Sequence, residues 1–115
     1  MDQNCIFCRI IAGQSPGEKV YEDDRVVAFN DLNPAAPIHI LIVPRDHIPS
    51  INQITQDQEA LIGHLFTTAK WLAKSNGIVD SGYRLIMNTG PDARQSVFHI
   101  HLHFLGGQPM RFSMG

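Results

Sequence analysis

The pattern of apolar and polar positions divides the chain into two helices and five strands. A long helix is predicted because apolar residues recur at helical spacing after Thr55-Gln56-Asp57-Gln58, which fits a capping box, and continue to Asn76-Gly77. These apolar positions are Leu61, Ile62, Leu65, Phe66, Ala69, Leu72 and Ala73. A short helix is predicted over residues 5–12, where the apolar stripe stops at Gly13. The strands are predicted over residues 19–22, 25–31, 38–43, 83–88 and 98–105.

The order of these elements predicts an α+β fold. One long helix among closely spaced strands is typical of an antiparallel sheet with its helices on one face, and the functional site is then expected on the other face. The strand over residues 38–43 is apolar on both faces, so it is expected near the centre of the sheet. The chain shows no repeat, linker or low-complexity segment, and residues 1–115 are predicted to form one domain.

The last predicted strand carries three histidines at alternating positions. His99, His101 and His103 share one face of a regular strand. The apolar residues between them are expected in the core: Phe98, Ile100, Leu102 and Phe104. Neighbours on one face lie roughly 7 Å apart, so a straight strand cannot bring three imidazoles to one metal ion at about 2 Å. At least one histidine must therefore differ in role, and because histidine titrates near neutrality and binds metals, this strand is predicted to carry the chemistry.

Composition and charge narrow the partners. The formal net charge is −2 and the nine Lys and Arg residues form no cluster, so nucleic acid is not expected as a partner. No apolar run reaches the ~20 residues of a membrane span, and the N-terminus lacks the features of a signal peptide, so a cytoplasmic protein without membrane contact is expected. A core this small would gain from oligomerisation. Cys5 and Cys8, at C-x-x-C spacing, indicate a metal pair or a redox pair rather than a structural disulfide.

The alternating histidines resemble the signature of the histidine triad (HIT) family of nucleotide hydrolases and transferases, and most closely its branch of histidine triad nucleotide-binding proteins. The resemblance covers nearly the whole chain. It includes the segments Cys5-Ile6-Phe7-Cys8-Arg9-Ile10-Ile11, Tyr21-Glu22-Asp23-Asp24-Arg25, Ala28-Phe29-Asn30-Asp31-Leu32-Asn33-Pro34-Ala35-Ala36-Pro37-Ile38-His39 and Gln95-Ser96-Val97. It implies a HIT-like fold, with a five-stranded antiparallel sheet, one short N-terminal helix and one long helix, and it implies a homodimer. It also implies hydrolysis of purine nucleoside 5′-phosphoramidates and acyl adenylates at the α-phosphate, through a nucleotidyl-histidine intermediate, with release of AMP.

The resemblance also implies catalytic roles. His101 matches the nucleophile that attacks phosphorus, with its tautomer held by a hydrogen bond from the other ring nitrogen to a main-chain carbonyl. His39 matches a fourth histidine that orients this arrangement, although without the motif it would be an ordinary buried residue. His103 matches the residue that hydrogen-bonds the phosphate oxygens. Gln95 and Ser96 are expected to donate to the phosphate and to the leaving atom.

Nucleoside recognition is implied for an earlier set of residues. Asp31 matches an acidic residue that accepts hydrogen bonds from the ribose hydroxyls, and Asn88 matches a polar contact near the phosphate or ribose. Six apolar residues match a slot for the purine ring, although core packing is the simpler explanation for each: Ile6, Phe7, Ile10, Phe29, Leu32 and Leu41. Arg94 stands where the best-known relatives carry glycine, which places a guanidinium able to bind an anion there. The C-terminal segment lacks the Trp-Pro-Pro-Gly ending of those relatives, so the resemblance says less about the preferred leaving group than about the core reaction.

A structural zinc site is predicted from Cys5, Cys8, His47 and His99. The C-x-x-C pair supplies two thiolates, and tetrahedral zinc needs two further nitrogen or sulfur ligands. His99 is available because the other histidines of the motif serve the nucleotide, and His47 matches a ligand position in relatives that carry both cysteines. His64, in the long helix, suits a surface or packing residue. The alternative is a pair of small buried cysteines without metal.

Two other functions stay open at this point. One is a nucleotide-binding or protein-interaction module with little turnover, although the intact His101 and Ser96 favour an enzyme. The other is a metallohydrolase with His101 and His103 as ligands, because H-x-H pairs on strands bind zinc. The sequence contains no glycine-rich phosphate loop, so any phosphate must be bound by the histidines and the nearby donors.

Overall fold

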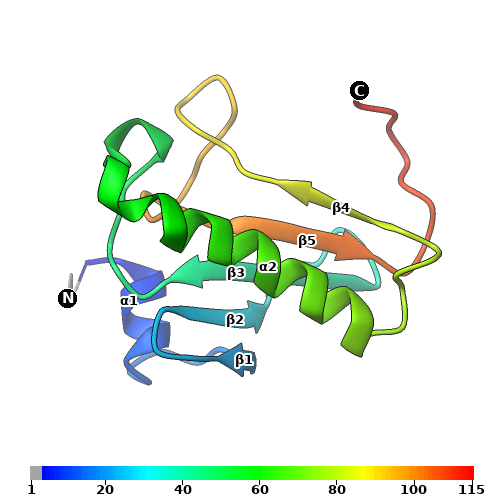
Figure 1. Cartoon of the computed structure of the whole chain (residues 1–115), viewed down its shortest axis with the longest axis horizontal. Helices are drawn as coiled ribbons and strands as arrows, with labels where there is room; N and C mark the ends of the chain where they lie inside the picture. The colour runs from blue at the N-terminus through cyan, green and yellow to red at the C-terminus, as the bar shows by residue number, and fades with distance from the viewer. Residues whose placement is uncertain (1–3) are drawn as a thin grey trace.

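Within residues 4–115, which the computed structural model describes, a five-stranded antiparallel sheet forms the framework of the molecule (Figure 1). Its strands lie in the order β1-β2-β3-β5-β4. The strands β1 to β5 span Lys19–Glu22, Val26–Asn30, Ile38–Pro44, Tyr83–Ile86 and Leu102–Gly106, and the helices α1 and α2 span Ile6–Ile11 and Glu59–Ser75. The predicted α+β class is confirmed. No helix in this part of the chain is both long enough and apolar enough to cross a membrane.

The helix α2 covers one face of the sheet (Figure 1). The predicted capping box forms, with the Thr55 main-chain N–H donating to the Gln58 side chain at 2.9 Å, and a 3₁₀ turn over Gln56–Gln58 leads into the helix. The residues buried between helix and sheet are Val26, Ala28, Ile40, Ile42, Ile48, Leu65, Ala69, Leu72, Ala73, Ile78, Ile100, Leu102 and Phe104. Each fully buried Leu or Ile side chain contributes about 1.5–3 kcal/mol. This face is filled by packing, so the chemistry must lie elsewhere.

The helix α1 packs on the opposite face, which corrects the expectation that both helices share one face. Cys5 is its N-cap, with Sγ accepting from the Cys8 main-chain N–H at 3.4 Å, and Gly13 follows it with a left-handed φ of 77°. The residues buried on this face are Cys5, Phe7, Cys8, Ile10, Ile11, Val27, Phe29, Leu41 and Val43. The physical reason is that β2 and β3 are apolar on both faces, so each face needs a cover.

The strand β5 begins later than the sequence predicted. The strand expected to begin at Phe98 is Leu102–Gly106, so only the last of the three motif histidines lies in a strand. The last pair of the ladder is Ile42 with Leu102, although β3 continues to Pro44. The residues before Leu102 leave the ladder: the Ile100 main-chain N–H donates to the Ile48 carbonyl at 2.8 Å, and the Pro44 carbonyl accepts from His99 Nε2. Phe98 is 59% exposed, which corrects its expected place in the core. The other strand ends differ from the prediction by at most two residues.

A half-buried polar cluster joins the β1–β2 turn to α2. The Asp23 carboxylate accepts the main-chain N–H groups of Arg25 and Val26 at 2.8 Å each, and the Tyr21 hydroxyl at 2.7 Å. His64 Nε2, from α2, lies 2.7 Å from the same carboxylate. Burial opposes the ionisation of Asp23, but the hydrogen bonds outweigh it and hold the pKa of Asp23 well below its usual range. His64 is therefore a packing residue that fixes the helix to the turn.

Candidate active site

A pocket of about 420 Å³ lies on the side of the sheet away from α2. Its lining includes the polar residues Asp31, Asn88 and Ser96 together with His101 and His103. The six apolar residues expected to hold a purine ring lie in the same lining: Ile6, Phe7, Ile10, Phe29, Leu32 and Leu41. The volume falls in the range typical of small-molecule sites. The structure thus brings the expected nucleoside and phosphate residues to one cavity.

The apolar side of the pocket is part core and part rim. The Phe7 ring lies edge-on to Phe29 and to His101, with ring centroids 5.4 and 5.0 Å apart. Both phenylalanines are buried, so they serve the core and the pocket wall together. Leu32 is 77% exposed and reaches the pocket from its rim. A planar ring in the slot would cover Leu32 and remove that apolar surface from water.

His101 is held in one tautomer. Its Nδ1 lies 2.9 Å from the main-chain oxygen of His99. A carbonyl can only accept, so the proton sits on Nδ1 and Nε2 carries the lone pair. The side chain is buried, and burial lowers the pKa of His101, although the hydrogen bond to His99 and the nearby Asp31 act in the other direction. A neutral imidazole with an available Nε2 in the pocket lining can act as a nucleophile.

His39 and His103 form a directional hydrogen-bond chain beside this nucleophile. The Ala35 main-chain N–H donates to His39 Nδ1 at 3.0 Å, so the proton of the neutral His39 ring sits on Nε2. That Nε2 lies 3.0 Å from His103 Nδ1 and 3.4 Å from an Asp31 carboxylate oxygen. His103 therefore accepts at Nδ1 and keeps its own proton on Nε2. Its Nε2–H is a donor for a ligand in the pocket.

Burial keeps both rings of this chain neutral. It lowers the pKa of His103 to about 4, with His101 and His39 acting in the same direction and Asp31 against it. Burial likewise lowers the pKa of His39, against the opposing effect of Asp31. His39 is therefore not a cation paired with Asp31, and one Asp31 carboxylate oxygen instead accepts the Asn33 main-chain N–H at 2.8 Å.

The cluster of Asp31, His39 and His103 does not suit a metal ion, although one ligand atom from each lies within 4.8 Å of the others. A metal at His39 Nε2 would require the ring proton on Nδ1, and Nδ1 already accepts from the Ala35 main-chain N–H. The cluster is a hydrogen-bond chain.

The four predicted metal ligands converge beside α1. Ligand atoms of Cys5, Cys8, His47 and His99 lie within 4.8 Å of one another. The sulfur–nitrogen distances are 3.4 Å for Cys5 with His99, 3.4 Å for Cys8 with His47 and 3.6 Å for Cys8 with His99. A tetrahedral zinc ion with Zn–S of about 2.3 Å and Zn–N of about 2.0–2.1 Å places sulfur and nitrogen roughly 3.5 Å apart. The donor set and its spacing fit zinc.

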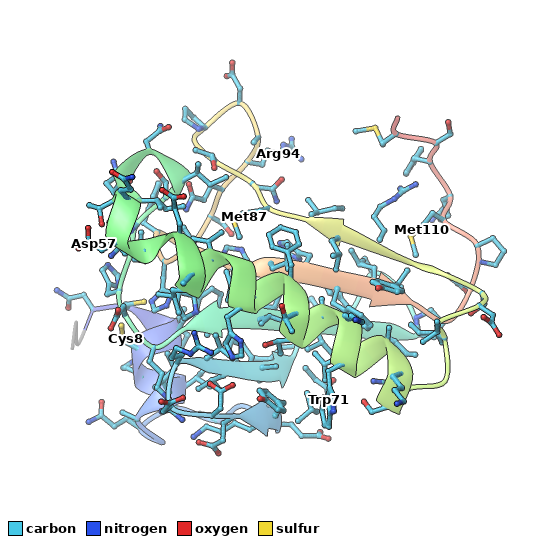
Figure 2. The ribbon with its side chains drawn as sticks, in the orientation of Figure 1. Cys8, Asp57, Trp71, Met87, Arg94 and Met110 are labelled. Atoms are coloured by element: carbon cyan, nitrogen blue, oxygen red, sulfur yellow. The ribbon has the colours of Figure 1, made fainter. Side chains whose placement is uncertain are left out.

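His99 has the tautomer that a ligand needs. Its Nε2 donates to the main-chain oxygen of Pro44 at 2.8 Å, which leaves the lone pair on Nδ1, the nitrogen near both cysteines. The side chain is fully buried, and burial lowers the pKa of His99 to about 4, against the effect of the hydrogen bond to Pro44. Four groups from three distant segments thus form one centre, and Figure 2 labels Cys8 at its place on α1.

Gln95 does not reach the pocket. Its amide nitrogen donates to the main-chain oxygens of Pro49 at 2.7 Å and Val97 at 3.1 Å, and its amide oxygen accepts from the Gly90 main-chain N–H at 3.0 Å. It is buried and is not among the described residues that line the pocket. The expectation that Gln95 donates to the phosphate is corrected, because all of these amide contacts fix the loop that carries Ser96.

Arg94 lies in the pocket lining on the loop between β4 and β5 (Figure 2). Its φ of 62° puts it in the left-handed region, and it is the non-glycine residue with a positive φ among residues 4–115. This region favours glycine, which agrees with the glycine that the resemblance places here.

The groups that the sequence failed to identify are mostly main-chain atoms. The Ala35 amide and the carbonyls of His99 and Pro44 fix the histidine tautomers. Main-chain atoms have no residue-type signal: the resemblance implied a carbonyl partner for His101 without naming its residue, and the rigid loop between Pro34 and Pro37 was the indication for the Ala35 amide. The sequence analysis also missed five further residues of the pocket lining: Pro16, Gly17, Asn30, Asn33 and Val97. The last three are next to expected site residues in the sequence, and that adjacency could have indicated them.

Comparisons with known proteins find relatives in sequence and in fold. A family model described as "Scavenger mRNA decapping enzyme C-term binding" matches residues 4–114. The chain is 46% identical over 110 residues to the purine nucleoside phosphoramidase of Escherichia coli K12, covering 96% of this chain and 92% of that protein. Among solved structures, a histidine triad protein from Clostridium difficile has a TM-score of 0.95 and 43% identity, with 99% of each chain covered. A HIT family hydrolase from Legionella pneumophila has a TM-score of 0.93 and 43% identity, covering 97% of this chain and 100% of that one.

Proposed function

The chain belongs to the histidine triad family, and we propose that it hydrolyses purine nucleoside 5′-phosphoramidates, and the related acyl adenylates, at the α-phosphate. The observation that carries the proposal is the tautomer of His101, whose Nδ1 is 2.9 Å from the His99 carbonyl, so that Nε2 is available in the pocket. The relative named a purine nucleoside phosphoramidase, at 46% identity, supports the choice of substrate. The catalytic unit proposed is one domain spanning residues 1–115.

The proposed reaction has two displacement steps. The lone pair of His101 Nε2 attacks the α-phosphorus, a P–N bond to His101 forms, and the bond between phosphorus and the leaving amine breaks. The amine leaves with the electrons of that bond and takes up a proton, for which the Ser96 hydroxyl is the nearby candidate donor. Water then attacks the same phosphorus, its proton replaces the one that Ser96 gave to the amine, the bond to His101 breaks, and AMP is released with Nε2 again unprotonated.

The other residues of the pocket bind and orient the substrate in this proposal. His103 Nε2–H donates to a phosphate oxygen as negative charge grows there, and losing one such donor typically reduces turnover about 10²–10³-fold. Asp31 accepts hydrogen bonds from the ribose hydroxyls, and Asn88 donates near the phosphate or ribose. The apolar slot between α1, β2 and β3 takes the purine ring.

We further propose that Cys5, Cys8, His47 and His99 hold a structural zinc ion. A zinc ion there would neutralise two buried thiolates and join the N-terminal segment to the residues before β5. Reduced cysteines of this kind are consistent with a cytoplasmic protein. The test is elemental analysis of untagged protein purified without chelator. The expected result is close to one zinc per chain, lost in a Cys5→Ser, Cys8→Ser variant; less than about 0.2 zinc per chain, or no difference between the proteins, would contradict the site.

We also propose that the chain forms a homodimer, as the family resemblance implies. The strand β4 is an edge of the sheet in the described part of the chain, and exposed edges pair readily. Three large apolar side chains that are exposed line one surface hollow between α2 and the start of β4: Trp71, Val79 and Tyr83. A second copy of this chain would cover them. Sedimentation analysis of the wild type is expected to give a dimer, and a Tyr83→Glu variant is expected to shift the population to monomer.

The activity is tested with an adenosine phosphoramidate that has a fluorogenic amine and a labelled phosphorus. In a single turnover we expect stoichiometric amine release and label on the peptide that contains His101, isolated under alkaline conditions. His64→Asn is the matched control, since it removes a histidine from the other face of the sheet and is expected to retain the labelled peptide. Label on any other residue would overturn the assignment of the nucleophile. Tight AMP binding without amine release would identify a nucleotide-binding module instead.

A further inference from the structure

We propose that Arg94 makes this enzyme prefer substrates whose leaving group carries a negative charge, a carboxylate or a phosphate, close to the scissile bond. The inference rests on the proposed hydrolase function and names the substrate class for it. It concerns a residue at which this chain departs from the glycine of its best-known relatives.

The loop holds Arg94 in a fixed position. The main-chain N–H of Gln95 donates to the Gly90 carbonyl at 3.1 Å, and that of Arg94 donates to the Pro91 carbonyl at 3.0 Å, which closes the loop. The buried Gln95 side chain then attaches the closed loop to the Pro49 carbonyl at 2.7 Å. The side chain at position 94 is therefore presented at the pocket by an ordered support, although the residue itself is exposed.

The backbone at Arg94 is one that an arginine adopts at a cost. Its φ of 62° favours glycine, and a glycine here would remove the strain. Strained residues are concentrated at functional sites, where the side chain does something that glycine cannot do. Among residues 4–115, the Arg94 guanidinium makes no hydrogen bond and no ion pair that would give it a structural purpose. Its charge is therefore available for a ligand.

Charge in the pocket gives Arg94 its importance. Asp31 is the acidic group of the lining, and Arg94 is the only Lys or Arg among the described lining residues. The histidines do not supply positive charge, because His101 and His103 each hold one proton and present one lone pair in the hydrogen-bond pattern. A substrate with an anion beyond the α-phosphate would therefore find one fixed cation in this site.

The position of Arg94 selects the leaving-group side of the phosphate. The purine slot and Asp31 belong to α1, β2, β3 and the residue after β2, so the nucleoside occupies that side. Arg94 and Ser96 come from another part of the lining, the loop between β4 and β5. Ser96 is the expected neighbour of the leaving atom, and Arg94 is two residues away on the same loop. A guanidinium there meets the departing group, and its planar donors match a carboxylate or a phosphate.

The experiment compares two substrates that differ only in charge. In both, AMP is joined through nitrogen to the same amino acid, with its carboxyl group free in one and present as the carboxamide in the other. The measured quantity is the ratio of kcat/KM for the carboxylate to that for the carboxamide. We expect a ratio of about ten for the wild type, of the order of one partly solvated charge-assisted contact, and a decline at high salt.

Three variants show whether Arg94 is the cause of the preference. Arg94→Gln keeps the backbone strain and removes the charge, so its ratio is expected to fall to within about twofold of one. Arg94→Lys keeps the charge, and most of the preference should remain, reduced by the loss of the planar fork. Lys74→Gln removes a cation from α2, and its ratio should equal that of the wild type. No preference in the wild type, or an unchanged ratio in Arg94→Gln, would overturn the proposal.

Binding separates this inference from the proposed reaction. The dissociation constants of the two compounds, measured by calorimetry on His101→Asn with and without Arg94→Gln, report the same ratio without turnover. If the wild-type protein hydrolyses neither compound but the binding preference depends on Arg94, the proposed hydrolysis is wrong and the assignment of Arg94 stands. A comparison of ADP with AMP in the same variants distinguishes phosphate from carboxylate as the better anion.

Discussion

His99 and His101 lie two residues apart, yet they belong to two different centres. In His99 the Pro44 carbonyl accepts the Nε2 proton, and the lone pair on Nδ1 lies near two cysteine sulfurs. In His101 the His99 carbonyl accepts the Nδ1 proton, and the lone pair on Nε2 lies in the nucleotide pocket. Both rings are buried and both are neutral. The position of one main-chain oxygen beside each ring therefore decides which histidine suits a metal and which suits an electrophile.

The substitution His101→Asn removes the pocket histidine of this pair and is expected to have the largest effect on turnover. Turnover should fall by about 10³-fold or more, because the nucleophile is gone. AMP affinity should stay within about tenfold, since His101 contributes to the chemistry more than to ground-state binding. Single-turnover rates and AMP calorimetry check this. Zinc content equal to that of the wild type is the control, and residual turnover above about one tenth would contradict the role.

The substitution His39→Phe breaks the hydrogen-bond chain while keeping an aromatic ring in β3. His103 then loses the partner that fixes its tautomer, so its Nε2–H is no longer directed to the phosphate. Turnover should fall about 10²-fold, the usual cost of losing one oriented donor. Stopped-flow assays at saturating substrate measure it. Activity within twofold of the wild type would show that His103 keeps its orientation without His39.

Metal removal tests the other side of the comparison. A zinc chelator should destabilise the protein by about 2 kcal/mol, a fall in Tm of roughly 10 °C, because α1 loses its attachment to the residues before β5. Turnover at a temperature where the metal-free protein stays folded should remain within about tenfold. Calorimetric melting and assays on the same samples check both. Complete loss of activity in folded protein, restored by added metal, would instead support a metallohydrolase.

The pH dependence carries the smallest expected effect. An exposed histidine protonates near pH 6.5, but burial lowers the pKa of His103 to about 4 and lowers those of His39 and His101 as well. The functional neutral forms therefore persist below pH 6.5, and kcat/KM should change less than about twofold between pH 8 and pH 6.5. The unfolded chain takes up these protons first, so the free energy of unfolding should decrease as the pH falls from about 6.5 toward 4. An acidic limb centred above pH 6.5 would contradict this.

The sequence predicted those parts of the fold that depend on hydrophobic periodicity. The capping box at Thr55 and the apolar stripe of α2 were sufficient for the long helix, and short alternating or continuously apolar runs were sufficient for the five strands. The start of β5 was wrong because Phe98 to His101 alternate as regularly as the strand that follows them. What ends the ladder is a pair of tertiary contacts, in which the Ile100 main-chain N–H donates to the Ile48 carbonyl and the Pro44 carbonyl accepts from the His99 side chain.

The candidate site was predictable in its residue types and less so in its geometry. The motif implied that the three histidines have unequal roles, and the structure places His99 in the cysteine cluster and the other two in the pocket. The role of Gln95 could not be read from the sequence, because a buried amide that supports a loop looks the same as one that binds a ligand. The left-handed backbone at Arg94 was likewise hidden, since only a glycine would have signalled it.

The position of β5 in the sheet has a consequence for biosynthesis. Of the five described strands this one is made last, yet it lies between β3 and β4, and β4 pairs with no other strand of the described sheet (Figure 1). A nascent chain that has not yet released residues 99–106 from the ribosome can form the hairpin of β1 and β2 and its pairing with β3, but it lacks both histidine centres. The candidate active site and the cysteine–histidine cluster can therefore form only after these residues have left the ribosome, and a chain truncated before residue 99 should lack nucleotide turnover because His99, His101 and His103 are missing.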